Sequence, residues 1–247
     1  MTDFGRRELL VGGAVAMGAI GTARAADGHG AAPAAPSHGT GHAAPAGAMT
    51  PDAALALLME GNRRFLADQV APHEFYNRTR RLHVAKGQSP FAICICCSDS
   101  RVSPELLFER GLGELFIIRV AGNTVDTAGM GSIEYAVEHL HAPLIVVMGH
   151  ERCGAVGAAC SVVTENASFP GSIGPMVEPI VPAALAVRDQ PGDFVDNAVR
   201  ANVRRVVHHL RFGPDPLLRE PMAQGKLKVV GAYYDLDTGA VDFFDRA

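Results

Sequence analysis

Four short apolar runs, rich in β-branched side chains, constrain the fold of this chain more than any other feature. They cover residues 91–97, 115–120, 144–148 and 227–234. Runs of this length without a polar face are typical of strands that are buried on both faces of a sheet. Stretches with helical spacing separate them, and this alternation predicts an α/β fold with a mostly parallel sheet flanked by helices. A fifth strand, 240–244, follows a turn at 237–239 and should form an antiparallel hairpin at one edge.

Local signals place three of the helices. Thr50 followed by Pro51 is a typical helix start, with a capping hydroxyl and then proline at the first helical position. A second helix should end near Pro143, because apolar residues before it recur at helical spacing. A third should start at Asp193, since the valines from 195 to 206 follow the same period.

The N-terminal segment is typical of an export signal. Arg6 and Arg7 precede an uncharged, mostly apolar run at 9–20, and residues 23–25 form an A-x-A cleavage pattern. The arginine pair resembles a twin-arginine signal. The run is too short to span a bilayer, so we expect a periplasmic protein without stable membrane insertion once residues 1–25 are removed. Residues 26–49, mostly Ala, Gly, Pro and His, should form a flexible tether to a folded domain at 50–247.

Charge and cysteine content exclude two classes of protein. The net charge of −4 argues against a nucleic-acid partner. Five cysteines in 247 residues are too few for a disulfide scaffold, and their odd number leaves at least one sulfur outside any intramolecular pair.

Reactive side chains follow two of the predicted strands. Cys97 ends the first, and His150 and Cys153 follow the third. The carboxyl ends of parallel strands lie at one edge of a sheet, where working groups gather. Two thiolates and an imidazole suit zinc, and three protein ligands leave a fourth position open for catalysis. His150 and Cys153 are three residues apart, so one turn at a helix start would aim both at one ion. Two alternatives remain: buried, unreactive cysteines, or a disulfide in an exported protein.

Asp99 and Arg101 lie just beyond Cys97 and alternate with serines. If the backbone stays extended there, both side chains point the same way as Cys97. A charge-assisted bond from Arg101 would keep the Asp99 carboxylate ionised and oriented. The alternative is an ordinary surface ion pair.

Two long motifs carry a family resemblance. Residues 97–104 (CSDSRVSP) and 134–154 (EYAVEHLHAPLIVVMGHERCG) resemble the two signatures of β-class carbonic anhydrases, and shorter similar stretches lie at 54–65, 87–90, 113–116 and 231–239. The resemblance covers roughly 50–247. It implies the β-carbonic anhydrase fold and one Zn²⁺ per chain on Cys97, His150 and Cys153, with zinc-bound hydroxide hydrating CO2 reversibly to bicarbonate and a proton.

The resemblance also assigns roles around the zinc. Asp99 would accept a hydrogen bond from the hydroxide, and Arg101 would hold Asp99 off the metal; in closed family members this aspartate replaces the water. The implied substrate pocket comprises Gln88, Phe116, Ala121, Tyr135 and Gly154. Gln88 matches a residue that acts across a dimer interface, so a homodimer or homotetramer is expected. From the residues alone, Phe116 and Tyr135 also fit plain core packing.

One family subclass has a regulatory bicarbonate site made of a tryptophan, an arginine and a tyrosine. Arg119 and Tyr135 match two of these positions, but the chain has no tryptophan and carries Cys94 at the third. The resemblance therefore implies no regulatory site of that kind.

Two other functions are compatible with the same ligands. Hydrolases of carbon disulfide or carbonyl sulfide resemble the same family, although Gln88 and Tyr135 favour CO2. The second is a non-catalytic zinc or thiol protein of the cell envelope, which would hold metal without turnover.

Overall fold

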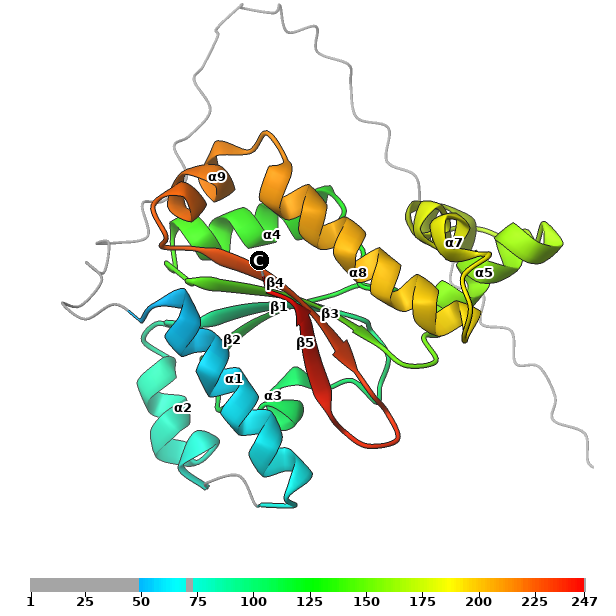
Figure 1. Ribbon diagram of the computed structural model, residues 1–247. Coiled ribbons are helices and arrows are strands. Elements are labelled where there is room, and N and C mark those ends of the chain that lie inside the picture. The colour runs from blue at the N-terminus through cyan, green and yellow to red at the C-terminus, as the bar shows by residue number, and fades with distance from the viewer. Residues whose placement is uncertain (1–48, 70–72, 247) are drawn as a thin grey trace, which may run out of the picture. The chain divides into compact units, whose positions relative to one another are not determined.

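A computed structural model describes residues 49–69 and 73–246, and its centre is a five-stranded sheet (Figure 1). The strands are β1 (Ala92–Cys96), β2 (Leu115–Arg119), β3 (Leu144–His150), β4 (Lys228–Tyr234) and β5 (Val241–Asp245). Their order is β2-β1-β3-β4-β5; the first four are mutually parallel and β5 pairs antiparallel with β4. The predicted α/β class and edge hairpin are confirmed.

The strand positions also agree with the sequence. β1 and β3 are buried along their whole length, as the absence of a polar face indicated. β3 extends two residues beyond the predicted end, so that His150 is itself the last residue of the strand. β2 is the edge strand and is buried less completely.

Helices connect the strands, and their starts follow the capping rules. The Thr50 hydroxyl accepts from the N–H of Ala53, and the Asp193 carboxylate accepts from that of Asp196, so both predicted caps are confirmed. The α-helices are α1 (Pro51–Leu66), α2 (Arg78–Val84), α3 (Pro104–Leu107), α4 (Thr127–Glu138), α5 (Gly154–Glu165), α6 (Ile173–Val177), α7 (Val181–Val187), α8 (Phe194–Phe212) and α9 (Pro216–Ala223). Short 3₁₀ turns cover His73–Phe75 and Glu178–Ile180.

The alternating side chains of the strands build two hydrophobic layers. One face of the sheet packs against α1 and α3, and the other against α4, α8 and α9 (Figure 1). A third cluster lies beyond the carboxyl ends of the strands, where α5 and α7 pack on the start of α8. Cys97 and Cys153 belong to this third cluster, so the candidate ligands are enclosed by helices rather than open on all sides.

Gly149 explains how α8 approaches β3 so closely. A Cβ atom at this position would lie 2.6 Å from a methyl of Val199 and 2.8 Å from one of Val203. Only glycine fits there without displacing the helix. This contact fixes α8 against the strand that ends in His150.

Within the described residues, no helix has the length and apolar character needed to cross a membrane. The predicted signal at 1–25 and nearly all of the tether at 26–49 lie outside the described part of the chain. Both stay predictions.

Candidate metal centre

The three predicted ligands meet at the carboxyl ends of β1 and β3, the middle two of the four parallel strands. Cys97 follows β1, His150 ends β3, and Cys153 is the N-cap residue of α5. β1 and β3 pair directly, which brings these ends together. His150 and Cys153 are therefore supplied by a strand end and a helix cap. They do not lie on one helical turn, as their i, i+3 spacing suggested.

The spacing of the ligand atoms fits a tetrahedral zinc ion. The Sγ atoms of Cys97 and Cys153 lie 3.9 Å apart, and the ligand atoms of Cys97, His150 and Cys153 all lie within 4.8 Å of one another. At the usual Zn–S bond length of about 2.3 Å, tetrahedral geometry separates two sulfurs by about 3.8 Å. The residues thus fit the metal without rearrangement of the two sulfurs.

The orientation of His150 supports the same conclusion. Its Nδ1 lies 2.9 Å from the carbonyl oxygen of Glu151, which only accepts, so Nδ1 carries the proton and donates. Nε2 then holds a lone pair. It is buried and has no hydrogen-bond partner among the described residues. A buried acceptor without a partner costs free energy, and a metal ion held by the two sulfurs would satisfy this one.

The two thiols titrate as a pair. Hydrogen bonds from the Cys153 thiol and from the Gly122 N–H hold the pKa of Cys97 well below its usual range, against the effect of burial. The resulting thiolate, which accepts from Cys153, together with burial, raises the pKa of Cys153. One proton thus leaves readily and the second is retained until a cation displaces it, so metal binding should release protons.

Asp99 and Arg101 form the predicted pair, but the backbone that brings them together is a turn and not an extended segment. The chain turns after Cys97, with the Val102 N–H donating to the Asp99 carbonyl at 3.0 Å, so the expected extended backbone is wrong. Arg101 donates from Nε to Oδ1 (3.0 Å), from its second terminal nitrogen to Oδ2 (2.8 Å), and from its backbone N–H to Oδ1 (2.9 Å). These bonds hold the pKa of Asp99 well below its usual range.

Asp99 lies next to the ligands without joining them. Its Oδ2 is 3.8 Å from His150 Nε2. It does not belong to the group of ligand atoms that lie within 4.8 Å of one another in the described chain. The carboxylate therefore borders the metal position while Arg101 occupies its outer side.

Arg119 supports this loop, a role that no sequence pattern indicated. Its guanidinium donates to the carbonyl of Cys97 at 3.0 Å and to that of Asp99 at 2.6 Å. Gly122 contributes as well, because its N–H donates to the Cys97 sulfur at 3.3 Å and its carbonyl accepts from the buried Asn202 at 2.9 Å. These contacts join residues 20 or more positions apart through backbone atoms, which leave no pattern in a sequence.

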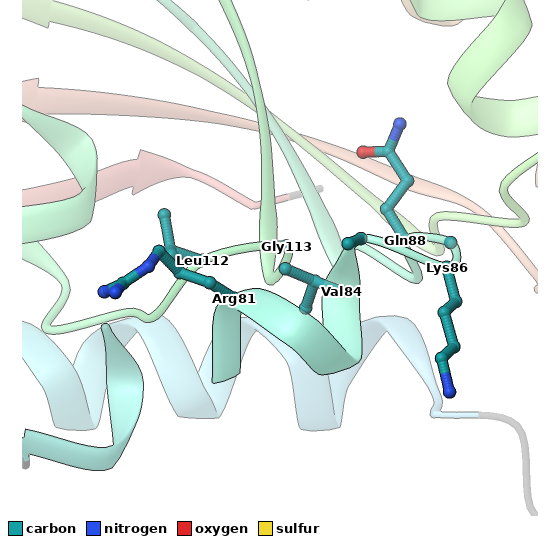
Figure 2. Close-up of a pocket in the computed structure, with 8 residues that line it drawn as sticks. Arg81, Val84, Lys86, Gln88, Leu112 and Gly113 are labelled. Atoms are coloured by element: carbon teal, nitrogen blue, oxygen red, sulfur yellow. The ribbon is translucent and has the colours of Figure 1, made fainter. Parts of the chain in front are cut away.

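The pocket residues implied by the resemblance fall into two groups. Ala121 precedes Gly122 and Gly154 follows Cys153, so both lie beside the ligands. Phe116 is near the start of β2 and contacts Tyr135, with ring centres 6.4 Å apart. Gln88 lies before β1, on the rim of a hollow of about 630 Å³ between α2 and the segment at 112–113 (Figure 2).

This division follows from the direction of the strands. The metal ligands lie after β1 and β3, whereas Gln88 lies before β1, at the opposite end of the sheet. Tyr135 is 48% exposed and Gln88 is also exposed. A single chain thus does not bring Gln88, Phe116 and Tyr135 to its own metal position.

The other three cysteines are separate from the centre. Cys94, Cys96 and Cys160 are buried, as predicted, and none of the five, all within the described residues, forms a disulfide. Burial raises the pKa of Cys96 to about 12 and that of Cys160 to about 11, so these thiols stay neutral and unreactive.

Comparison with known proteins identifies the family. The family model described as "Carbonic anhydrase" matches residues 92–241, which include all three ligands. The chain belongs to the β-class carbonic anhydrases. Carbonic anhydrase 2 of Mycobacterium tuberculosis is 40% identical over 76% of this chain and 90% of its own. The carbonic anhydrase of Mycolicibacterium smegmatis is 38% identical over 78% and 92%.

Solved structures agree with this family. A tetrameric β-carbonic anhydrase of Sordaria macrospora superposes with a TM-score of 0.62 at 26% identity, covering 68% of this chain and 87% of that one. The chain is therefore a zinc-dependent carbonate dehydratase, which interconverts CO2 and bicarbonate, and Cys97, His150 and Cys153 are the residues that fit its metal.

Proposed function

We propose that this chain hydrates CO2 at Cys97, His150 and Cys153, with Asp99 and Arg101 controlling the attacking oxygen. The observation that carries the proposal is the free lone pair of buried His150 Nε2, which lies 3.8 Å from Asp99 Oδ2. Zinc bound to such ligands lowers the pKa of a coordinated water and so supplies hydroxide near neutral pH.

The hydrogen bonds around Asp99 define which of its atoms acts. A carboxylate offers about four acceptor positions, two on each oxygen. Oδ1 accepts twice from Arg101 and Oδ2 accepts once. The remaining position on Oδ2 is on the side of His150, so Oδ2 would accept a hydrogen bond from the attacking oxygen and thereby orient a lone pair of that oxygen toward CO2. Arg101 keeps the carboxylate ionised and holds it outward.

A direct test compares substrates on one preparation. Zinc stoichiometry near one per chain together with fast CO2 hydration in a stopped-flow assay is the expected result. Cys153→Ser should lose both. Zinc binding without CO2 hydration would contradict the proposal; turnover of carbon disulfide in that case would identify the alternative hydrolase.

We also propose that the enzyme is at least a dimer whose subunits complete each other's substrate pockets. Within the described residues, β2 is an edge strand with one unpaired side, and Gln88, Phe116 and Tyr135 lie near its amino end, away from their own metal position. The Sordaria macrospora relative is tetrameric. Gln88→Ala should leave zinc content and oligomer size unchanged while raising KM, and a monomer in light scattering would refute the arrangement.

Export to the periplasm remains part of the proposal and rests on the sequence of residues 1–25. Replacing Arg6 and Arg7 by lysine should retain the protein in the cytoplasm if the twin-arginine route is used. Cell fractionation measures this directly, and unchanged periplasmic protein would exclude that route.

A further inference from the structure

The turn between two of the ligands has an unfavourable backbone conformation. Arg152 lies between His150 and Cys153 and has a φ of +50°. Residues with a side chain rarely adopt this left-handed region, because Cβ crowds the backbone. Such a residue persists where the surrounding structure holds it in place.

The side chain of Arg152 supplies that restraint. Its two terminal nitrogens donate to the two carboxylate oxygens of Asp237, at 2.9 and 2.6 Å, and one of them also donates to Glu151 at 2.8 Å. A two-pronged pair of this kind fixes orientation as well as distance. Asp237 belongs to the turn between β4 and β5, 85 positions further along the chain.

Glu151 connects the same two segments. Its carboxylate accepts from the N–H of Leu236 at 3.0 Å, and its own N–H donates to the carbonyl of Tyr234 at 2.9 Å. The β4–β5 turn is itself ordered, since Asp235 accepts from the N–H groups of Asp237 and Thr238. Both residues 151 and 152 are thus bonded to one rigid turn.

We propose that Asp237 is a positioning residue for the metal centre, acting through Arg152. By holding the strained turn, it fixes the separation of His150 Nε2 and Cys153 Sγ before metal arrives. The proposal rests on zinc binding by these ligands. The side chains of Arg152 and Asp237 are 52% and 68% exposed, so the pair contributes little to global stability. Its effect should appear in metal retention.

The test measures release of zinc to a chromogenic chelator from the zinc-loaded protein. Asp237→Ala should release zinc about tenfold faster than wild type, the lower end of the loss of metal affinity that follows removal of a group that orients a ligand. Asp242→Ala is the matched control, because Asp242 lies on β5 of the same β4–β5 hairpin as Asp237. The substitution removes an exposed carboxylate, which here pairs with Arg200 of α8 at 3.1 Å. It should release zinc at the wild-type rate.

Thermal unfolding of the zinc-free proteins separates positioning from general stabilisation. Asp237→Ala should melt within about 3 °C of wild type. Unchanged zinc release, an equal increase in Asp242→Ala, or a much lower melting temperature of zinc-free Asp237→Ala would each overturn the proposal.

Two substitutions at Arg152 test the backbone part of the inference. Arg152→Ala and Arg152→Gly both remove the guanidinium, but only glycine adopts a positive φ without strain. Arg152→Gly should therefore release zinc more slowly than Arg152→Ala, and equal rates would contradict the role of the strained turn. Wild-type protein that binds no zinc would refute the metal assignment itself, which is a distinct outcome.

Discussion

Replacing Asp99 by asparagine changes one atom of the site from an acceptor to a donor. Oδ1 receives two hydrogen bonds from Arg101 and Oδ2 receives one. In Asp99→Asn, the oxygen of the new amide will therefore take the Oδ1 position, where the two donors are. The amide nitrogen is then left on the side of His150, where it can donate a hydrogen bond but cannot accept one from the attacking oxygen.

The magnitude follows from the bond that is lost. A hydrogen bond to a charged group contributes about 1.5–3 kcal/mol, and each ~1.4 kcal/mol is a factor of ten in rate. We therefore expect kcat/KM for CO2 hydration to fall about 100-fold. Zinc content should stay near wild type, because Asp99 is not one of the grouped ligands.

The assay is stopped-flow CO2 hydration with a pH indicator, alongside zinc analysis of the same samples. Asp52→Asn serves as the matched control: it neutralises an exposed carboxylate that pairs with Lys228 at 2.9 Å, and it should have wild-type activity. Activity of Asp99→Asn within about threefold of wild type at full zinc content would refute the proposed role.

Three further outcomes are expected. Arg119→Met removes the donors to the carbonyls of Cys97 and Asp99 and should lower activity about tenfold. The free energy of unfolding in urea should fall by less than about 1.5 kcal/mol. Arg205→Met, at an exposed position, is the control. Gly149→Ala should lower the free energy of unfolding by about 1–3 kcal/mol through collision with α8. Gly157→Ala, whose new Cβ would meet no atom within 4 Å beyond its chain neighbours and the backbone of its own helix, should be neutral or slightly stabilising. Zinc removal followed by diamide should reduce the five titratable thiols to three by joining Cys97 to Cys153, whose sulfurs are 3.9 Å apart, whereas zinc-loaded protein should keep all five.

The sequence predicted the sheet well because burial dictates composition. The strands that lead to Cys97 and His150 are buried on both faces, so nearly every position in them is apolar and the pattern is unambiguous. The region at 166–192 carried no such pattern, and no helix was predicted there. Proline usually interrupts helices. Two prolines of this region instead occupy the first turns of the 3₁₀ segment and of α7, where proline is tolerated.

The sequence predicted the metal ligands but not the residues that hold the ligand loops in place. Metal ligands are identified by side-chain chemistry, and two thiols with an imidazole have few other uses in such a motif. Arg119 acts on carbonyl oxygens, which every residue has, and Asp237 acts on an arginine 85 positions away. The turn after Asp99 was likewise hidden, because the bond that closes it joins backbone atoms, the Val102 N–H and the Asp99 carbonyl.

The order of the strands explains why supports and ligands come from different parts of the chain. The inner strands β1 and β3 lead to the ligands Cys97 and His150, while the outer parallel strands β2 and β4 lead to Arg119 and Asp237. Each outer strand thus supplies a charged side chain that holds the loop of the inner strand beside it: Arg119 holds the loop after β1, and Asp237 holds the turn after β3. A parallel sheet makes this division possible, because four strand ends open at the same edge. The crossover that places β2 outside β1 is therefore part of how this fold builds a metal site, since it brings Arg119 to the side of the Cys97 loop.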